Sequence, residues 1–240
     1  MRKLLASLLA LAVLLVIVDR VSSAVAAGVL ADQIRTEASL GTDPHVTFGG
    51  FPFLTQAADG RYHDVRVAVE GVPVGRLRGV AVDAHLHDVH LPLADVVGRH
   101  VGRIPVDQVT GTATVAYPEL ARAVGSARGA RIDSVSRDGD GLKVRATASI
   151  AGQELTATAR ASVRVDQGAL VVTANRVTVD NLPGNALGAA ALAGQLSFRV
   201  PLDGLPFNLR VTDVHVGDHG LGVSAQAHDV VLNGAVHRGG

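Results

Sequence analysis

A long apolar stretch lies at the start of the chain. Leu4–Val18 contains a single polar residue and directly follows the positive charges of Arg2 and Lys3. A run of this length is typical of the hydrophobic region of a signal peptide, and it is shorter than the roughly 20 residues that a membrane-spanning helix needs. A buried core helix fits poorly, because the stretch is apolar on every side. The pattern therefore predicts export, with the positive charges kept inside.

Two outcomes are open for this export segment. Small residues at Ala24–Ala26 form a pattern that signal peptidase cleaves. Against cleavage, Asp19 and Arg20 interrupt the approach to that site, and helical periodicity continues beyond it. We expect residues 1–26 to be a signal peptide or an uncleaved signal anchor, and residues 27–240 to form a single domain.

Apolar and polar residues alternate along much of the chain from Tyr62 onward. A period of two indicates half-buried strands. In the first of these strands, Val65, Val67 and Val69 share one face, and charged residues occupy the other.

The clearest alternation predicts a strand over residues 154–165. One face is wholly aliphatic and consists of Leu155, Ala157, Ala159, Ala161, Val163 and Val165. The strand is about twice the usual length of five to six residues. Long alternating strands indicate an antiparallel sheet with one solvated face.

Glycine-rich turns separate several of these alternating runs. We expect hairpin turns with positive-φ glycines at Arg137–Gly141, Asp166–Gly168 and Gly217–Gly220. Asp138 and Asp140 in the first turn also suggest a calcium site. No downstream Glu completes an EF-hand loop, however, so a plain turn is favoured.

Three segments share a break in their alternation. In the runs that begin at Gly79, Gly168 and Gly220, the pattern slips near a His-Asp or Asn-Arg pair and resumes with the opposite parity. A parity slip inside a strand is what a β-bulge produces, and bulges bend and twist a sheet. Repeated bulges predict a strongly curved sheet.

Short helices are expected between the strands. Residues 117–125 place Pro118 at the first helical turn and Gly125 as a stop. Residues 183–194 are compatible with a helix although rich in glycine, and residues 93–100 fit one or two further turns.

The composition excludes several classes of protein. At 240 residues and 48% apolar content, the chain can bury a sizeable core. Lys plus Arg and Asp plus Glu both number 22, and the basic residues are scattered, so nucleic-acid binding is disfavoured. The absence of cysteine removes disulfides, thiolate zinc sites and cysteine nucleophiles. Only 3% of residues are aromatic, so the core is built from small aliphatic side chains.

The small side chains of the aliphatic face have two explanations. Because protein interiors are close-packed, either another element approaches closely, such as a helix lying against Ala157–Ala161, or space is left for a ligand. A curved sheet lined by small aliphatic residues is suited to acyl chains. Exposing an acyl chain of about sixteen carbons to water costs on the order of 12 kcal/mol, at roughly 0.8 kcal/mol per methylene. Such a ligand therefore needs a wall that covers nearly its whole length.

Catalytic and metal-binding motifs are weak. His85 and His87 lie two positions apart with Asp88 and His90 nearby, which raises a metal hypothesis, but the parity slip puts the third ligand in doubt. Solvent-facing histidines at a bulge are favoured. The sequence contains no GxSxG motif and no Gly-rich phosphate loop after a strand. We therefore predict no catalytic residues, no metal site and no cofactor, with a metal-dependent hydrolase as a minor alternative.

Phenylalanines crowd into one short stretch. Phe48, Phe51 and Phe53 lie within six positions, and a second Pro-Phe corner occurs at Leu205–Phe207. Pro52 prevents a regular strand ladder at the first corner. These phenylalanines either close the end of an aliphatic tube or form the lip through which a lipid enters.

The export segment, the stretch "FGGFPFLTQAADGRYHDVRV", the "YPEL" that precedes a helix, and the closing "VPLDGLPFNLRVTDVHVGDHGLGVSAQAHDVVL" together resemble the LmeA-like phospholipid-binding family of actinobacterial cell-envelope proteins. The resemblance covers essentially the whole chain after the export segment. It implies a tubular lipid-binding (TULIP-like) fold of the α+β class, in which a strongly curved and mostly antiparallel sheet wraps a long helix. It also implies binding of phospholipids, including phosphoinositides, at the outer face of the plasma membrane.

We therefore predict an exported, membrane-associated protein that binds or transfers phospholipid in an apolar groove without covalent chemistry. The alternative is a structural or adaptor protein of the envelope. The candidate lipid-binding residues are Phe51, Phe53, Leu54, Val65, Val67, Val69, Leu155, Ala157, Ala159, Ala161, Val163, Leu205 and Phe207.

Overall fold

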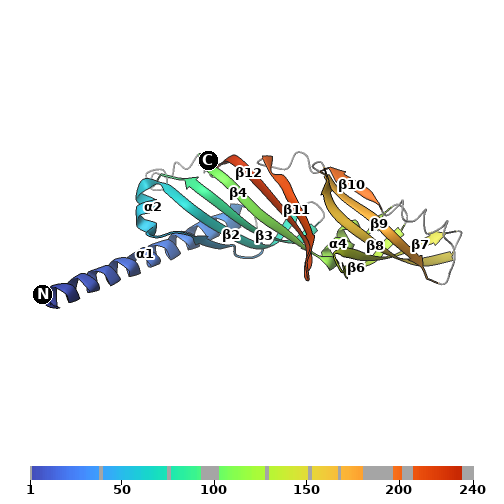
Figure 1. The fold of residues 1–240 in the computed structure, drawn as a ribbon, viewed down its shortest axis with the longest axis horizontal. Helices are drawn as coiled ribbons and strands as arrows, with labels where there is room; N and C mark the ends of the chain where they lie inside the picture. The colour runs from blue at the N-terminus through green and yellow to red at the C-terminus, as the bar shows by residue number, and fades with distance from the viewer. Residues whose placement is uncertain are drawn as a thin grey trace. The chain divides into compact units, whose positions relative to one another are not determined.

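The fold belongs to the α+β class, with a long N-terminal helix and two antiparallel sheets (Figure 1). We describe it from a computed structural model, in which residues 2–37, 40–74, 77–92, 103–127, 130–150, 153–166, 169–180, 197–201 and 208–233 are placed. The predicted class, the antiparallel sheet and the apolar N-terminal helix are confirmed. The helices expected at residues 93–100 and 183–194 lie outside the described residues, as do Leu205 and Phe207.

Two compact units make up the chain. Unit 1 comprises Met1–Glu70, Asp83–Gly111 and Ala227–Gly240, and unit 2 comprises Gly71–Val82 and Thr112–Gln226. Four strands contribute residues to both units, so the expectation of a single domain after residue 27 stays a prediction.

Helix α1 (Arg2–Glu37) continues well past the apolar stretch. Its first half projects beyond the rest of unit 1 (Figure 1), and its large apolar side chains from Leu4 to Val18 are 44–76% exposed. Its second half packs on β1 and α2. The apolar stretch and the segment that packs on unit 1 are therefore one continuous helix.

Sheet A has six strands in the order β1-β2-β3-β4-β12-β11. Its strands are β1 (His45–Phe48), β2 (Arg61–Val74), β3 (Leu77–His90), β4 (Arg103–Ala116), β11 (Arg210–Val216) and β12 (Gly220–Asn233). On β2, Val65 and Val69 are buried and Val67 is half-buried, as their alternation predicts.

Sheet B, which lies within unit 2, has six strands in the order β10-β9-β8-β7-β6-β5. Its strands are β5 (Ser126–Ala127), β6 (Ala130–Asp138), β7 (Gly141–Ile150), β8 (Gln153–Asp166), β9 (Ala169–Val179) and β10 (Phe198–Pro201). The long predicted strand is β8. It occupies an interior position between β7 and β9, with antiparallel register on both sides.

The three predicted parity slips are confirmed. Asp88 on β3 and Asp229 on β12 have positive φ angles of 51° and 53° at the His-Asp pairs. On β9, the register with β8 shifts at Asn175, because Arg176 pairs with Arg160 while Ala174 pairs with Ala161. Each slip therefore coincides with a local irregularity that changes which residues face the core.

Short elements at the start of sheet A were missed by the sequence analysis. The corner after β1 leads into helix α2 (Phe53–Asp59), where the sequence analysis expected only a Pro-Phe corner. Seven residues are too few to establish a helical period, and the pattern around Pro52 gave no other signal. The predicted helix at residues 117–125 is confirmed as α4 (Tyr117–Val124), with Gly125 at its C-terminal end.

The predicted hairpins join β6 to β7, β8 to β9 and β11 to β12. Residues 167 and 168 of the second turn, with the glycine expected there to have positive φ, lie outside the described residues. Gly139 in the first turn has the expected positive φ of 64°. For Gly217–Gly220 the expectation of positive-φ glycines is wrong. Gly220 is needed for a different reason, since a Cβ built there would lie 2.2 Å from the carbonyl oxygen of Val115.

Replacing Gly220 by Ala tests this close approach. The new methyl group would force the β4 and β12 backbones apart, and we expect the free energy of unfolding to fall by about 2–3 kcal/mol. Gly41→Ala is the matched control because nothing lies within 4 Å of its Cβ position. It should change stability by less than about 0.5 kcal/mol in the same denaturant titration. Equal stabilities of the two variants would contradict the close approach.

Candidate functional site

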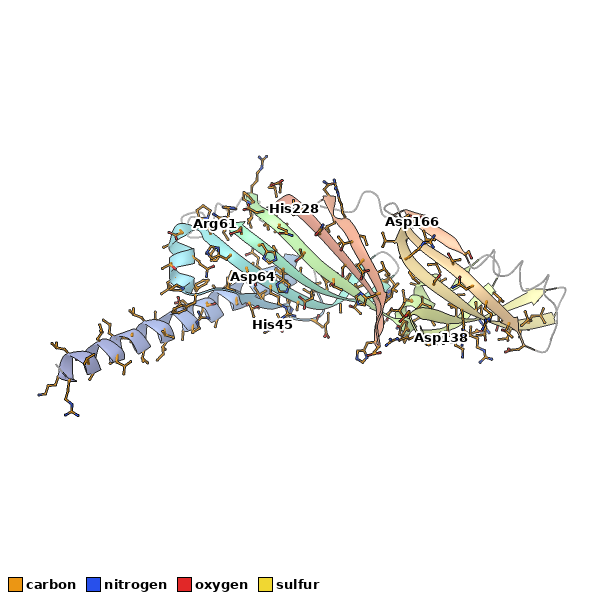
Figure 2. The ribbon with its side chains drawn as sticks, viewed as in Figure 1. His45, Arg61, Asp64, Asp138, Asp166 and His228 are labelled. Atoms are coloured by element: carbon orange, nitrogen blue, oxygen red, sulfur yellow. The ribbon has the colours of Figure 1, made fainter. Side chains whose placement is uncertain are left out.

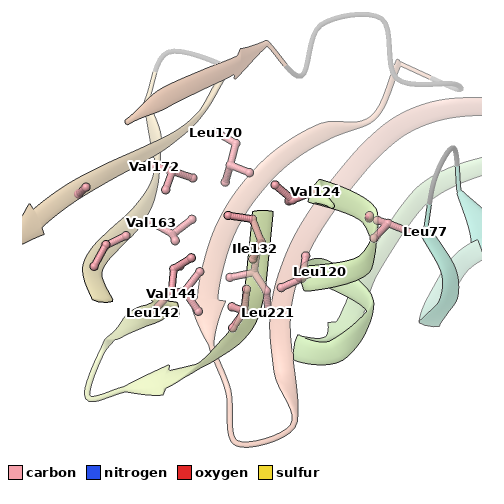
Figure 3. A pocket seen from close by; sticks show the side chains of 15 residues that line it. Leu77, Leu120, Val124, Ile132, Leu142, Val144, Val163, Leu170, Val172 and Leu221 are labelled. Atoms are coloured by element: carbon pink, nitrogen blue, oxygen red, sulfur yellow. The ribbon is translucent and has the colours of Figure 1, made fainter. Parts of the chain in front are cut away.

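An apolar cavity of about 310 Å³ lies inside unit 2 (Figure 3). Every residue that lines it is aliphatic, and the side chains labelled in Figure 3 point toward a common centre. They come from β3, α4, β6, β7, β8, β9 and β12: Leu77, Leu120, Ala123, Val124, Ile132, Val135, Leu142, Val144, Ala159, Ala161, Val163, Leu170, Val172, Ala174 and Leu221. The volume is at the lower end of the roughly 300–1,000 Å³ found for ligand pockets.

Side-chain size across sheet B explains why this face is hollow. Ala159 on β8 lies beside the larger Val144 on β7, and Ala161 lies beside Leu142. Further along β8, Val163 pairs with Val172 of β9. The small residues therefore occupy the middle of the patch and the larger ones its flanks. Cross-strand neighbours on one face lie about 4.5–5.5 Å apart, so this arrangement leaves a shallow trough along β8.

The small aliphatic face of β8 was expected either to be approached closely by a helix or to leave open space. The structure shows a helix near one end of this face and open space near the other. Ala121 of α4 packs against Ile132 and Ala146, which form a small buried cluster. Close approach of a helix therefore fills the face near Ala146. Near Ala161 the space is left open and forms the cavity. The helix that the sequence analysis weighed against a ligand forms one wall of the site.

Helix α4 is held in place at its first turn. Pro118 fixes the start of the helix, and the buried Tyr117 hydroxyl donates a hydrogen bond to the carbonyl oxygen of Gly217 at 2.5 Å. Burial raises the pKa of Tyr117, so its hydroxyl stays protonated and remains a donor over the physiological range. Glu119 packs against Gly79 and accepts a hydrogen bond from Arg122. The helix therefore presents Leu120 and Val124 to the cavity from a fixed position.

A more polar groove adjoins the cavity and shares Ile132 and Val135 with it. Its lining includes the guanidinium groups of Arg122 and Arg131, both largely exposed, together with the carboxyl group of Asp133. A hydrogen bond from Thr147, and then one from Arg131, lowers the pKa of Asp133, so this carboxyl is ionised at neutral pH. The groove thus combines charged groups with two residues that also belong to the aliphatic lining.

The structure divides the predicted site residues into separate groups. Ala159, Ala161 and Val163 line the cavity, whereas Ala157 and Leu155 lie further along the same face of β8 and do not. The other described candidates belong to unit 1: Phe51, Phe53, Leu54, Val65, Val67 and Val69.

Several lining residues were missed by the sequence analysis. Leu170 and Val172 alternate on β9 in the same manner as the residues of β8, so their pattern contained the signal. Leu120, Val124 and Leu221 reach the cavity from α4 and β12. Only the tertiary arrangement brings these three to it.

The histidines predicted to be solvent-facing lie beside aspartate side chains on sheet A. His85 and His87 both approach Asp64 Oδ1, at 3.3 and 3.5 Å, and their rings stack. His90 lies 2.9 Å from Asp107. Figure 2 marks Asp64 on β2. Within the described residues, no group of three or more His, Asp or Glu side chains is arranged to hold a metal ion.

The fold and the site together define a class of protein. An α+β chain with an aliphatic cavity and an apolar N-terminal helix has the features of a protein that accommodates apolar ligands. The model of the LmeA-like phospholipid-binding family matches residues 17–226, and the chain belongs to this family. Neither the curated proteins nor the solved structures contain a match to the chain.

Proposed function

We propose that this protein is exported and binds phospholipid at the outer face of the plasma membrane, holding acyl-chain carbons in the cavity of unit 2 without covalent chemistry. The observation that carries the proposal is the wholly aliphatic lining of a ligand-sized cavity in a member of a phospholipid-binding family. The apolar N-terminal helix supports export, since it fits a signal segment or an anchor.

The cavity favours an acyl chain over water. Aliphatic walls offer water no hydrogen-bonding partners, and apolar cavities of this kind take up apolar ligands. Each methylene that enters is stabilised by about 0.8 kcal/mol relative to water. Several carbons enclosed between β8 and α4 therefore provide a substantial binding free energy without any charged contact.

The polar groove beside the cavity is the proposed place for the headgroup. Arg122 and Arg131 supply guanidinium groups that hydrogen-bond phosphate oxygens. Both already pair with carboxylates, to Glu119 and Asp133. Phosphate must compete with these partners, so we expect the groove to contribute selectivity for anionic lipids, including phosphoinositides, and the cavity to contribute most of the affinity.

Displacement of a fluorescent phospholipid tests the proposal. A probe with an environment-sensitive acyl group should brighten on binding the full-length protein, and unlabelled phospholipid should reverse the change. Phosphatidylinositol should displace the probe at lower concentration than phosphatidylcholine. Replacing Arg122 and Arg131 together by Ala should reduce that preference a few-fold. Displacement by phosphatidylcholine should weaken by a smaller factor, because this lipid carries a phosphate group but no net charge.

Other outcomes separate the alternatives. Absence of probe binding, together with recovery of one protein partner at fixed stoichiometry, would favour the structural or adaptor function and contradict lipid binding. A tightly bound metal that is lost on replacing His85 and His87 would instead support the metal-dependent hydrolase.

A further inference from the structure

The apolar half of α1 has no protein surface to cover it among the described residues. Residues Arg2–Thr36 are long and apolar enough to cross a membrane, and only 6% of the most apolar window is buried. A cleaved signal sequence passes the same test. The contacts made by the residues that follow the apolar stretch therefore distinguish a cleaved signal peptide from a retained anchor.

The residues just after the apolar run are part of the folded unit 1. Asp19 is 2% exposed, and its Oδ1 accepts a hydrogen bond from the backbone N–H of Leu54 at 2.9 Å. This N–H lies in the first turn of α2, where backbone donors have no partner within the helix. Pro52 precedes the helix and supplies no side-chain cap. A carboxylate from α1 thus provides the cap that α2 lacks.

Arg20 makes a second contact with the corner between β1 and the start of α2 (residues 49–54). Its Nη2 donates to the carbonyl oxygen of Gly50 at 3.4 Å, and its guanidinium carbon lies 5.0 Å from the centroid of the Phe51 ring. Arg20 Nη2 also lies 3.2 Å from Asp19 Oδ2, a close ion pair that lacks hydrogen-bond geometry. Cleavage after Ala26 would remove both residues and leave the Leu54 N–H without its partner. These contacts therefore favour retention of the helix.

The corner has a hydrogen-bonded interior and an exposed apolar surface. Gln56 is buried, donates to the carbonyl oxygen of Gly49 at 3.1 Å and accepts from the backbone N–H of His63 at 3.0 Å. On the outside, Phe51 is 60% exposed and Leu54 is 41% exposed. Both project where the apolar half of α1 leaves unit 1, because Asp19 and Arg20 contact this corner and the apolar run ends at Val18.

The length of the apolar run indicates what these two side chains contact. At about 1.5 Å per residue, Leu4–Val18 spans about 22 Å, against a hydrocarbon thickness of about 30 Å. Arg2 and Lys3 can extend their charges to the far headgroups. On the near side, the apolar run is several ångströms too short to reach the headgroups. The corner makes up this missing length if it enters the interface, where apolar side chains penetrate about 5–10 Å. Aromatic and Arg side chains are suited to that depth.

We propose that α1 is retained as a membrane anchor, and that Phe51, Leu54 and Arg20 form an interfacial corner seated in the headgroup region of the bilayer that α1 enters. The occupant of this surface is the lipid bilayer. The contact of Asp19 with α2 fixes the corner at the point where the anchor emerges. This inference goes beyond phospholipid binding in the cavity and does not rest on it.

Single-tryptophan fluorescence tests the corner, because the chain contains no tryptophan. We would reconstitute full-length Phe51→Trp into vesicles of phosphatidylcholine and phosphatidylglycerol, with bromine on the acyl chains in a parallel sample. Leu54→Trp serves as a second probe if the first variant is unstable. Val231→Trp on β12 is the matched control, because Val231 is similarly exposed, at 47%, in the same unit.

We expect brominated lipid to quench the emission of the Phe51→Trp variant strongly and aqueous acrylamide to quench it weakly, with the opposite pattern for the Val231→Trp variant. If acrylamide quenched the Phe51→Trp variant as strongly as the control, the proposed location of the corner in the headgroup region would be wrong. Equal quenching of both variants by brominated lipid would also contradict the proposal, because membrane contact would then not be confined to the corner.

Intact mass measurement of the protein from the membrane fraction of expressing cells tests retention. We expect a chain that still contains Asp19 and Arg20. A mature chain that begins near Ala27 would overturn the anchor. Phospholipid content is measured on the same sample after extraction, so a failure of the cavity proposal is distinguishable from a failure of the anchor.

Discussion

Ala161→Phe should reduce the phospholipid that co-purifies with the full-length protein by at least about tenfold. Ala161 lies on the central strand of the trough, between Leu142 and Ala174 on the neighbouring strands, and it lines the cavity. A phenyl ring at this position occupies the space proposed for acyl carbons. Because the ring fills space that already exists, the free energy of unfolding should change by less than the 1–3 kcal/mol, roughly, that overpacking of a filled core costs. Lipid extraction and quantification per mole of protein provide the measurement.

Thr158→Phe is the matched control for this change. Thr158 lies on the same strand and points to the opposite face, between Arg145 and Thr178. The same ring added there should leave the phospholipid content unchanged. Loss of lipid in both variants would indicate a general disturbance of β8, and retention of lipid in Ala161→Phe would place the ligand elsewhere.

Phe53→Ala should lower the free energy of unfolding by about 3–5 kcal/mol, the range for removing a buried Phe side chain. Phe53 is 6% exposed, and its ring centroid lies 5.2 Å from that of Phe48 and 5.9 Å from that of Tyr62. Truncation would open a cavity in the middle of this aromatic cluster. Thermal or denaturant unfolding of the full-length protein measures the loss.

Phe51→Ala is the comparison for the neighbouring aromatic. Its ring is mostly exposed and contacts the Arg20 guanidinium, so its removal should cost less than about 1 kcal/mol. Similar losses for Phe51→Ala and Phe53→Ala would contradict the different positions of these two rings.

The sheet was the part of the fold that the sequence predicted best. Regular alternation on β8 identified the strand and its aliphatic face, because side chains of a strand point alternately to its two faces. The slips at Asp88, Asn175 and Asp229 were visible as well, since a bulge moves every following residue to the other face. These features are local, and a single strand contains the whole signal.

The two phenylalanines show what local patterns could not resolve. Phe51 and Phe53 are two positions apart and looked equivalent, yet one is exposed and the other buried. Their difference arises from α2, which begins at Phe53 and turns that side chain toward Phe48 and Tyr62. The role of Asp19 was equally hidden, because its partner is 35 positions away along the chain.

The cavity shows the same limit on a larger scale. The aliphatic face of β8 predicted either a helix or a ligand, and the two explanations could not be separated without the position of α4. Leu120 and Leu221 approach the trough from separate elements, so the cavity depends on the tertiary arrangement. The polar groove with Arg122 and Arg131 likewise depends on where α4 meets β6.

Native mass spectrometry of the gently purified full-length protein tests the central proposal, phospholipid binding in the cavity of unit 2, most directly. The account predicts a mass increment equal to one phospholipid on the unmodified protein, its loss in Ala161→Phe and its retention in Thr158→Phe. An unmodified protein that carries no lipid, or an increment that persists in Ala161→Phe, would contradict it.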